Sequence, residues 1–448
     1  MTDGGIVRRQ GYWPMSPVVG SRGARTRERI VAEALTLFEQ QGFRATSVES
    51  IARAAGTSRA TLYQYFESKE QIFVELMDEC GAALRRVARR IGALGPTRAG
   101  FHNLHWWLGE WAWVYDKYAT LFGQWADLEP GNTGVRHLVH GFVGSYNRWI
   151  ADRLAECGVS GVDPGEAALV LTSTVHRFNY FRHQRTGLPP ADEAVDGLAV
   201  VLQLMLFPET PAEAFAGLPD PPPRGRVHRG GAPGVAPDAG HPTELSPRAA
   251  VTVGEMVKAG ARLFAERGYH GTSVDDVVAE AGFARATFYK YFDEKSDLLL
   301  RLTEESSSGA AELCRDLAVL EPGPDLGPGL RDWLRRYLPF YRRYLGVFRA
   351  GIDGGSGDAR VTALARQVNA DLAAAVGAVL ARVERAYPLD RGVATVVVMA
   401  VLDRMPEYAR FVGDDDDRIV ELAATVLERG PFNGATASAS ARTGAPGG

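Results

Sequence analysis

Cysteine is scarce in this sequence, and long apolar runs are missing. The three cysteines, Cys80, Cys157 and Cys314, are far apart and form no CxxC pair, so neither a zinc ribbon nor a disulfide framework is indicated. The longest strongly apolar run, Val393–Leu402, is much shorter than the roughly 20 residues that a membrane span needs. Residues 1–20 contain no apolar core of signal-peptide length. These absences predict a soluble protein that stays in the cytoplasm.

An excess of positive charge is also missing. The 448 residues carry a formal net charge of −4, so any contact with nucleic acid must come from local basic patches. There is no glycine-rich phosphate loop, nucleophile elbow, HExxH motif or convincing pair of acids. The sequence therefore predicts a protein that is not an enzyme, and it predicts no cofactor and no metal site.

The sequence does contain an internal repeat. The stretch TSRATLYQYFESKE, Thr57–Glu70, returns 226 residues later as FARATFYKYFDEKS, Phe283–Ser296. The same offset relates residues far downstream, so that Trp107, Tyr115 and Phe122 have Trp333, Tyr341 and Phe348 as their equivalents. A match that extends over about eighty residues indicates a duplicated and fused unit.

The two copies are separated by a segment that is rich in proline, glycine and alanine, residues 208–247. Such a composition buries too little apolar area to order itself, so we expect a linker. We expect flexible tails at 1–24 and 431–448, and in each copy a short N-terminal domain, at 25–72 and 248–298, followed by a longer one, at 73–207 and 299–430.

Each copy opens with helical patterns. A first apolar stripe, which contains Ile30, Ala34, Leu37 and Phe38, ends at Gly42. Thr46 begins a second helix, and Glu49 follows three residues later in the pattern of a capping box. Gly56 supplies a turn, a short helix runs over 58–65, and Ser68 caps the next helix. Two short helices joined in this way form a helix-turn-helix.

The segment GFRATSVESIARAAGTSRATLYQYFESKEQIF resembles the DNA-binding domain of TetR-family transcriptional regulators, and GYHGTSVDDVVAEAGFARATFYKYFDEKSDLL is similar to it in the same way. The resemblance covers about fifty residues of each copy and rests on the Gly-aromatic stop, the Thr-Ser start, the Ala-Gly turn and the Tyr-x-x-Phe-x-x-Lys ending. It implies an all-α protein with two tandem units. Each unit would have an N-terminal three-helix DNA-binding domain followed by a helical ligand-binding and dimerisation domain.

The recognition helix of such a domain presents its first side chains to base edges in the major groove. By position, the candidates for base contact are Thr57, Ser58, Arg59, Thr61 and Gln64 in the first head, and Arg285, Thr287 and Lys290 in the second. The resemblance implies phosphate contacts for Thr46, Ser47, Tyr63 and Lys69, and for their equivalents Thr272, Ser273, Tyr289 and Lys295. Arg25, Arg27 and Arg29 could add further phosphate contacts or an arm that reaches into a groove. The alternative is that Tyr63 packs in the core and that Lys69 is a solvated charge.

The two heads are not equivalent. Phe283 and Ala284 replace Thr57 and Ser58, so the second recognition helix loses its polar N-cap, a change that typically costs about 1 kcal/mol. The second head would then read a different half-site, hold DNA mainly through phosphates, or have lost DNA binding.

A stripe of aromatic residues marks the ligand-binding region of the first unit. Trp107, Trp111, Tyr115, Tyr118, Phe122 and Trp125 follow one another at helical spacing, with a short break after Lys117. Such a stripe usually forms core; the functional alternative is a pocket for a planar or hydrophobic effector, lined by Trp107, Trp111, Tyr115 and Phe122 together with Phe178. The resemblance implies that the last two helices of each unit form a dimer interface.

Histidines offer a further alternative, because His102 with His105, and His137 with His140, lie at i, i+3 spacing. With His176 they could form a metal site in the first unit, although separate histidines are the simpler interpretation.

The sequence therefore predicts a transcriptional regulator of double-stranded operator DNA, most simply a repressor that a small effector releases, acting as an intramolecular pseudo-dimer or a homodimer on the nucleoid. The alternative is that the first unit alone reads DNA and that the second serves dimerisation or ligand binding.

Overall fold

The computed structural model describes residues 21–43, 45–128, 133–159, 161–184, 188–219, 246–323, 325–352, 357–385, 387, 389–413 and 415–433. The side chains at 21, 22, 123–138, 184, 352 and 410–412 lie outside this description. Within it every regular element is a helix, which confirms the predicted all-α class. None of the described helices is long and apolar enough to cross a membrane. The contacts divide the chain into two compact units, residues 1–187 and 188–448.

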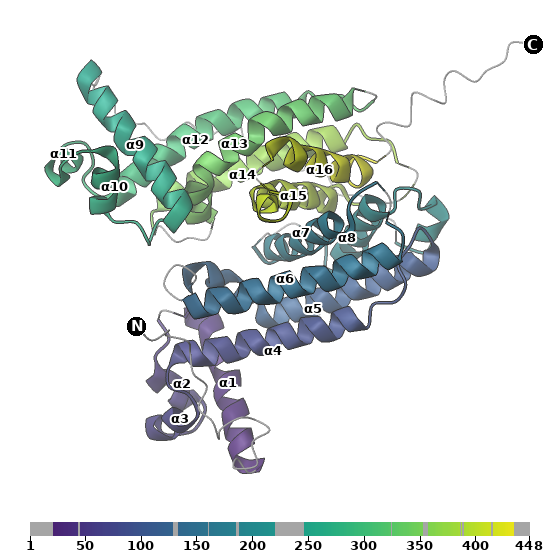
Figure 1. The fold of residues 1–448 in the computed structure, drawn as a ribbon, viewed down its shortest axis with the longest axis horizontal. Coiled ribbons are helices and arrows are strands. Elements are labelled where there is room, and N and C mark those ends of the chain that lie inside the picture. The colour runs from purple at the N-terminus through teal and green to yellow at the C-terminus, as the bar shows by residue number, and fades with distance from the viewer. Residues whose placement is uncertain are drawn as a thin grey trace, which may run out of the picture. The chain divides into compact units, whose positions relative to one another are not determined.

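The first unit consists of a small three-helix head and a bundle of longer helices (Figure 1). The head comprises α1 (Ser21–Gln41), α2 (Val48–Ala54) and α3 (Arg59–Tyr65), and the bundle comprises α4 (Lys69–Arg89), α5 (Arg98–Leu128), α6 (Thr133–Glu156) and α7 (Pro164–Gln184). The apolar stripe of α1 meets α2, and α2 packs on α3. Ile30, Phe38, Ile51, Leu62 and Phe66 are buried in the head. Helix α4 begins in the head and continues into the bundle, where it packs on α5 and α6.

The turns of the head agree with the sequence, with one correction. Gly42 and Gly56 have φ values of 81° and 59°, which a residue with a side chain rarely adopts. The cap of α2, however, is Ser47 rather than Thr46: the Ser47 hydroxyl accepts the N–H of Ser50, and the Ser50 hydroxyl in turn accepts the N–H of Ser47. The predicted capping box was therefore wrong by one residue, because Thr46 is buried instead.

The aromatic stripe of α5 is interrupted where the sequence predicted a break. Tyr118 has φ −118° and ψ 19°, so the helix bends at this residue. Trp107, Tyr115 and Tyr118 are buried against the rest of the bundle, so these three side chains contribute to its core. The Trp125 side chain lies outside the described residues.

The second unit repeats the order of the first in α9 to α15, and it has one further α-helix before this repeat and one after it (Figure 1). Its head comprises α9 (Pro247–Arg267), α10 (Val274–Ala281) and α11 (Arg285–Tyr289). Its bundle comprises α12 (Lys295–Ala318), α13 (Leu326–Ile352), α14 (Ala359–Leu380), α15 (Arg391–Val412) and α16 (Asp416–Arg429). The elements before the repeat are α8 (Ala191–Leu206) and the short 3-10 helix η1 (Ala212–Phe215).

Helix α8 packs on α15 and α16 of the second unit, although it precedes the linker in the sequence. By the repeat offset it is the equivalent of α16. Every residue from Gly197 to Leu206 is buried, and α8 approaches α15 so closely that a Cβ added to Gly197 would lie 2.8 Å from Cγ1 of Val393. The last helix of the first repeat thus shares a core with the last two helices of the second.

The start of the expected linker is folded onto this unit. Phe215 of η1 is 2% exposed, and its ring centroid lies 5.4 Å from that of Tyr387. The structure therefore has ordered residues at 208–219, because Phe215 contributes an apolar anchor that the overall composition of the segment conceals. Residues 220–245, like most of both expected tails, lie outside the described residues.

Helix α13 makes an unusually close approach to the second head. A Cβ on Gly346 would overlap the backbone carbonyl of Phe264 in α9, so the absence of a side chain sets the distance between these helices. The first repeat has Thr120 at the equivalent position. The second head is thus packed against its bundle by a contact that the first head does not share.

We expect Gly346→Ala to lower the free energy of unfolding by about 1–3 kcal/mol, because the new Cβ meets backbone that cannot rotate away. Gly377→Ala is the matched control: it lies in α14, where the nearest atom to a new Cβ is Thr395 Oγ1 at 3.9 Å, and it should gain up to about 1 kcal/mol from helix propensity. Urea denaturation followed by circular dichroism measures both. Equal stability of the two variants would contradict the close approach of α13 to α9.

Candidate nucleic-acid interface

The recognition helix of the first head, α3, is short and capped. The Ser58 hydroxyl accepts the N–H of Thr61 at 3.0 Å, and the two hydroxyl oxygens are 2.8 Å apart. Leu62 is buried on the inner face of α3, whereas Ser58, Arg59 and Gln64 are exposed on its outer side. Two of the predicted base contacts, Ser58 and Thr61, therefore also form the cap of the helix.

Arg59 is held by two groups. Its guanidinium lies 2.6 Å from the Glu49 carboxylate of α2, and it donates to the Tyr63 hydroxyl at 3.3 Å, one helical turn along α3. The hydrogen bond to Tyr63 and the charge of Glu49 raise the pKa of Arg59 above its ordinary value. The guanidinium carbon also lies 5.4 Å from the centroid of the Tyr63 ring, a cation–π contact that favours this orientation of the side chain.

The second head repeats this arrangement. The Arg285 guanidinium lies 2.8 Å from the Asp275 carboxylate of α10 and donates to the Tyr289 hydroxyl at 3.3 Å. The hydrogen bond to Tyr289 and the charge of Asp275 raise the pKa of Arg285 in the same way. The sequence analysis identified the arginine and the tyrosine but missed the carboxylate. The acids at equivalent positions of the two copies, Glu49 and Asp275, could have indicated it.

These arginines are available to a ligand even though each has a partner. The Arg59 side chain is 59% exposed, as is that of Arg285, and exposed ion pairs contribute little to stability because water competes for them. A guanine edge or a phosphate can therefore replace the carboxylate at small cost, while the tyrosine still orients the guanidinium plane.

The lysines that the resemblance assigned to phosphate face inward. Lys69 Nζ donates to the carbonyl oxygens of Phe43 and Thr46, at 2.8 Å and 3.0 Å. Lys295 Nζ does the same with Tyr269 and Thr272, both at 2.7 Å, and burial lowers its pKa. In this structure each lysine joins the first residue of the long helix to the turn between the first two helices.

The threonines of this turn are also internal. Thr46 and Thr272 are each 1% exposed, and their hydroxyls donate to the carbonyl oxygens of Gly42 and Gly268, at 2.7 Å and 2.9 Å. Ser47 and Ser273 next to them are exposed and cap α2 and α10. Of these four residues, the two serines are placed where a phosphate could reach the side chain.

The arginines of α1 have structural partners as well. Arg27 is 9% exposed and lies 2.8 Å from the Glu75 carboxylate of α4, and Arg29 Nε donates to the carbonyl of Ala55 at 2.7 Å. The expectation of an arm was therefore wrong for Arg27, because its side chain is buried and paired within the unit, whereas Arg29 is exposed and its contact with phosphate stays a prediction.

The two recognition helices differ as the sequence predicted. Ala284 caps α11 without a side-chain hydrogen bond, and α11 has five residues where α3 has seven. Lys290 follows the last residue of α11, exposed, with its Nζ 5.6 Å from the centroid of the Tyr291 ring. Thr287 is half-buried, as is Thr57 in the first head. The second head thus presents fewer polar side chains on a shorter helix.

The candidate ligand residues form a stacked cluster inside the first unit. The rings of Tyr115 and Phe122 are parallel within 2°, with their centroids 4.7 Å apart, and Trp111 stacks on both. His176 of α7 meets Phe122 edge-on at 5.3 Å. Phe178, on the same helix, is fully buried.

Buried polar atoms accompany this cluster. The indole nitrogens of Trp107 and Trp111 and the Tyr146 hydroxyl have no hydrogen bond of normal geometry within the described residues. Burial raises the pKa of Tyr146, and the neighbouring Trp111 and Trp107 N–H groups act in the opposite direction. Three polar groups thus lie close together in an apolar interior, where each one gains from a hydrogen-bonding ligand or water.

The histidines do not assemble into a metal site among the described side chains, where no group of three histidine, cysteine or acidic residues could hold an ion. His102 and His140 are exposed, whereas His176 belongs to the aromatic cluster. The His137 side chain lies outside the description.

Comparison with known proteins finds a match in each of the two heads. The model of the family described as bacterial regulatory proteins, tetR family, matches residues 30–76 and 256–302. An uncharacterized HTH-type transcriptional regulator of Bacillus subtilis, YdgC, is 32% identical over 71 residues, 16% of this chain and 36% of that protein. The HTH-type transcriptional regulator AcrR of Shigella flexneri is 43% identical over 53 residues, which are 12% of this chain and 25% of that protein.

A repressor gives the longest of these alignments. The HTH-type transcriptional repressor AcnR of Corynebacterium diphtheriae is 32% identical over 98 residues, 21% of this chain and 50% of that protein. The chain therefore spans between a quarter and a half of the length of these curated relatives. A solved transcriptional regulator from Aquifex aeolicus VF5 is 17% identical, with 40% of this chain and 96% of that one covered and a TM-score of 0.29.

We expect exchange of the caps to change the local stability of the recognition helices in opposite directions. Ser58→Ala removes a side-chain acceptor and should weaken α3 by about 1 kcal/mol, whereas Ala284→Ser should strengthen α11 by a similar amount. Hydrogen exchange of the full chain, followed by mass spectrometry, should show about fivefold faster exchange in residues 59–65 and slower exchange in residues 285–289, respectively. The unmodified head in each variant is the control, and unchanged rates in both would show that the caps do not limit opening.

Proposed function

We propose that the chain is a DNA-binding transcriptional regulator, because the model of the tetR family of bacterial regulatory proteins matches it twice, at residues 30–76 and 256–302. In this proposal it is a repressor that binds double-stranded operator DNA through two non-identical heads, and a small hydrophobic effector releases it.

The repeated restraint on the recognition arginine carries this proposal. In both heads an exposed arginine is oriented by a tyrosine one turn along the same helix and by a carboxylate of the preceding helix. A core requires no such triad, since all three groups lie at the surface. A pre-oriented planar guanidinium suits a guanine edge, which accepts two parallel hydrogen bonds.

Around each arginine we propose a smaller set of contacts than the sequence alone indicated. In the first head these are Ser47, Thr57, Ser58, Thr61, Tyr63 and Gln64, and in the second head Ser273, Thr287, Tyr289 and Lys290. We assign Thr46, Lys69, Thr272 and Lys295 to the support of the turn, since their side chains bind its carbonyl groups.

The effector site that we propose is the aromatic cluster of the first unit. Trp107, Trp111, Tyr115, Phe122 and Phe178 offer stacked faces, and the buried Trp107, Trp111 and Tyr146 polar atoms offer donors. An effector that inserts here would be planar and apolar, with one hydrogen-bond acceptor. Because α4 continues from this bundle into the head, separation of the bundle helices would move the head.

We further propose that one chain supplies both heads of an operator complex. Helix α8, from the first repeat, packs on α15 and α16, the pair that the resemblance assigns to the dimer interface of the second. With α8 in place, that face is covered from within the chain. A second copy has correspondingly less apolar surface to bind.

A second candidate function rests on the weaker recognition helix. Helix α11 lacks a side-chain cap and has five residues, which favours a regulator whose first unit reads DNA while its second unit serves dimerisation or ligand binding. Separate tests of the two arginines distinguish this alternative from the two-headed regulator.

Selection of bound DNA from a random pool supplies the site, and the variants then test each head. We expect Arg59→Ala and Arg285→Ala each to weaken binding of the selected site by about 5- to 150-fold, the range for loss of one bidentate base contact. Arg148→Ala is the control, because this exposed arginine of α6 lies outside both heads. No effect of Arg285→Ala would establish the second candidate, and no enrichment at low salt would exclude DNA binding altogether.

Native mass spectrometry tests whether a single chain, rather than a dimer of chains, is the unit that supplies both heads. We expect the free protein at micromolar concentration to have the mass of one chain, 48.5 kDa. Gly197→Leu should displace α8 by collision with Val393 and so produce species of twice that mass, as the face of α15 and α16 becomes available. Gly141→Leu is the control, since a Cβ there has nothing within 4 Å. A wild-type dimer would favour two chains per operator.

A further inference from the structure

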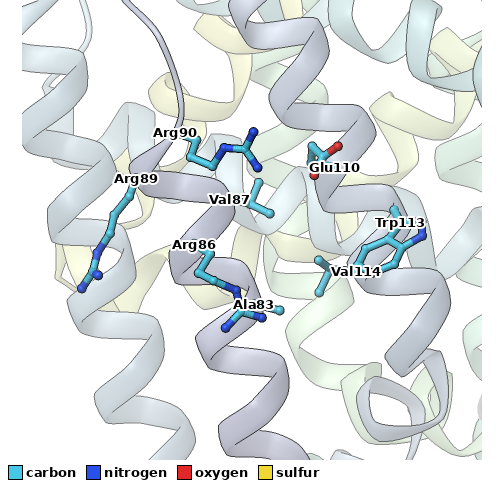
Figure 2. Close-up of a pocket in the computed structure, with 8 residues that line it drawn as sticks. All are labelled: Ala83, Arg86, Val87, Arg89, Arg90, Glu110, Trp113 and Val114. Atoms are coloured by element: carbon cyan, nitrogen blue, oxygen red, sulfur yellow. The ribbon is translucent and has the colours of Figure 1, made fainter.

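A surface groove of about 340 Å³ lies between the second half of α4 and the middle of α5 (Figure 2). Its apolar floor consists of Ala83, Val87 and Val114, all buried. Its rim is charged and aromatic, and is formed by Arg86, Arg89, Arg90, Glu110 and Trp113. None of these residues belongs to the DNA-binding heads or to the proposed effector cluster.

The arginine side chains of the groove have no carboxylate partner among the described residues. There, the side chains of Arg86, Arg89 and Arg90, all of which are exposed, form no ion pair and no hydrogen bond. Figure 2 shows the Arg86 and Arg90 side chains extending toward α5, whereas Arg89 extends away from it. Glu110 is the single acid of the lining and lies beyond ion-pair distance, so the groove has an excess of positive charge.

An exposed tryptophan completes the rim. The Trp113 side chain is 63% exposed, on the face of α5 that points away from the buried aromatic cluster. Next to the groove, the Arg90 guanidinium carbon lies 5.2 Å from the centroid of the Trp106 ring, which restrains that arginine. A large aromatic surface beside restrained guanidinium groups is a recognition surface for a flat anion.

The second repeat shows that the fold does not need this groove. At the equivalent positions Glu312 replaces Arg86 and Pro339 replaces Trp113. Arg90 and Glu110 are replaced by Asp316 and Arg336, which form an ion pair at 2.5 Å. The same two helices therefore pack with oppositely charged, paired side chains at the positions of Arg90 and Glu110, and without an exposed tryptophan at the position of Trp113. The groove of the first unit is a separate feature that needs its own explanation.

We propose that this groove binds a small planar organic anion. Arg86 and Arg90 hold its carboxylate or an equivalent acidic group, its ring lies along Trp113, and its apolar edge covers Val87 and Val114. Size favours a small molecule over a protein segment: residues 83–90 of α4 span about 10 Å, and the volume is at the lower end of ligand pockets, whereas a stable protein partner covers about 800 Å² on each side. The proposal does not depend on DNA binding.

Isothermal titration calorimetry of the full chain with 2-naphthoate and with 2-naphthalenemethanol tests the anion requirement. We expect one naphthoate per chain, bound at least about tenfold more tightly than the alcohol, because a hydroxymethyl group lacks charge-assisted hydrogen bonds. Arg86→Gln/Arg90→Gln should weaken naphthoate at least about tenfold, and Trp113→Ala should weaken both probes. Arg148→Gln/Arg315→Gln, which removes the same charge from exposed sites elsewhere, should bind like the wild type.

Several outcomes would overturn the proposal. These are equal affinity for acid and alcohol, equal affinity of the two double variants, and loss of binding in Trp111→Leu alone, which would place naphthoate in the inner cluster. Binding of a capped peptide with one tryptophan between glutamates, without binding of naphthoate, would assign the groove to a protein partner instead. DNA selection on the same preparation distinguishes this proposal from the proposed function. If the protein binds naphthoate but enriches no DNA, the groove proposal holds and the regulator is excluded. If it enriches DNA but does not bind naphthoate, the regulator holds and the groove proposal is excluded.

Discussion

One lysine in each head fixes the geometry on which the rest of the structure depends. Lys69 and Lys295 are the first residues of α4 and α12, and each ammonium group binds two carbonyl oxygens of the turn between the first two helices of its head. These are charge-assisted hydrogen bonds in a partly buried place, where they are stronger than at the surface. The long helix and the turn therefore move together. Any change in the direction of α4 or α12 within its bundle is transmitted to the recognition helix by this contact as well as by the chain itself.

The head of each unit packs against its own bundle, but the contacts between head and bundle differ between the two units. In the second unit Gly346 lets α13 touch the backbone of α9, which restricts the head from the bundle side. In the first unit Thr120 occupies that position, where its side chain leaves no room for the same approach of backbone to backbone. The first head instead has the capped recognition helix and the larger set of polar side chains. The head with the better reading surface is therefore the one with the looser attachment, and the proposed effector cluster lies in the same unit.

Much of this could be predicted from the sequence because it depends on near neighbours. The stop at Gly42, the turn at Gly56, the cap at Ser58 and the break near Tyr118 each follow from a few adjacent residues. The contacts that were missed join distant residues. Arg27 and Glu75, or Arg29 and the carbonyl of Ala55, meet because α1 crosses the head, and no local pattern reveals such a crossing. Helix α8 has an apolar sequence that any bundle could accept, so its partners are decided by the tertiary fold. The groove beside Trp113 appears when α4 and α5 are placed next to each other.

The duplication has a consequence for how such a protein can change over generations. In a symmetric homodimer each substitution appears in both subunits, so a change that improves one half-site contact is imposed on the other. Here the two recognition helices are encoded separately, 226 residues apart, and Ala284 could replace its capping serine while Ser58 was kept. Each head, each bundle and each surface groove can thus be inherited and selected independently. In the proposed two-headed regulator, the pair would be free to follow a DNA sequence that has no symmetry of its own.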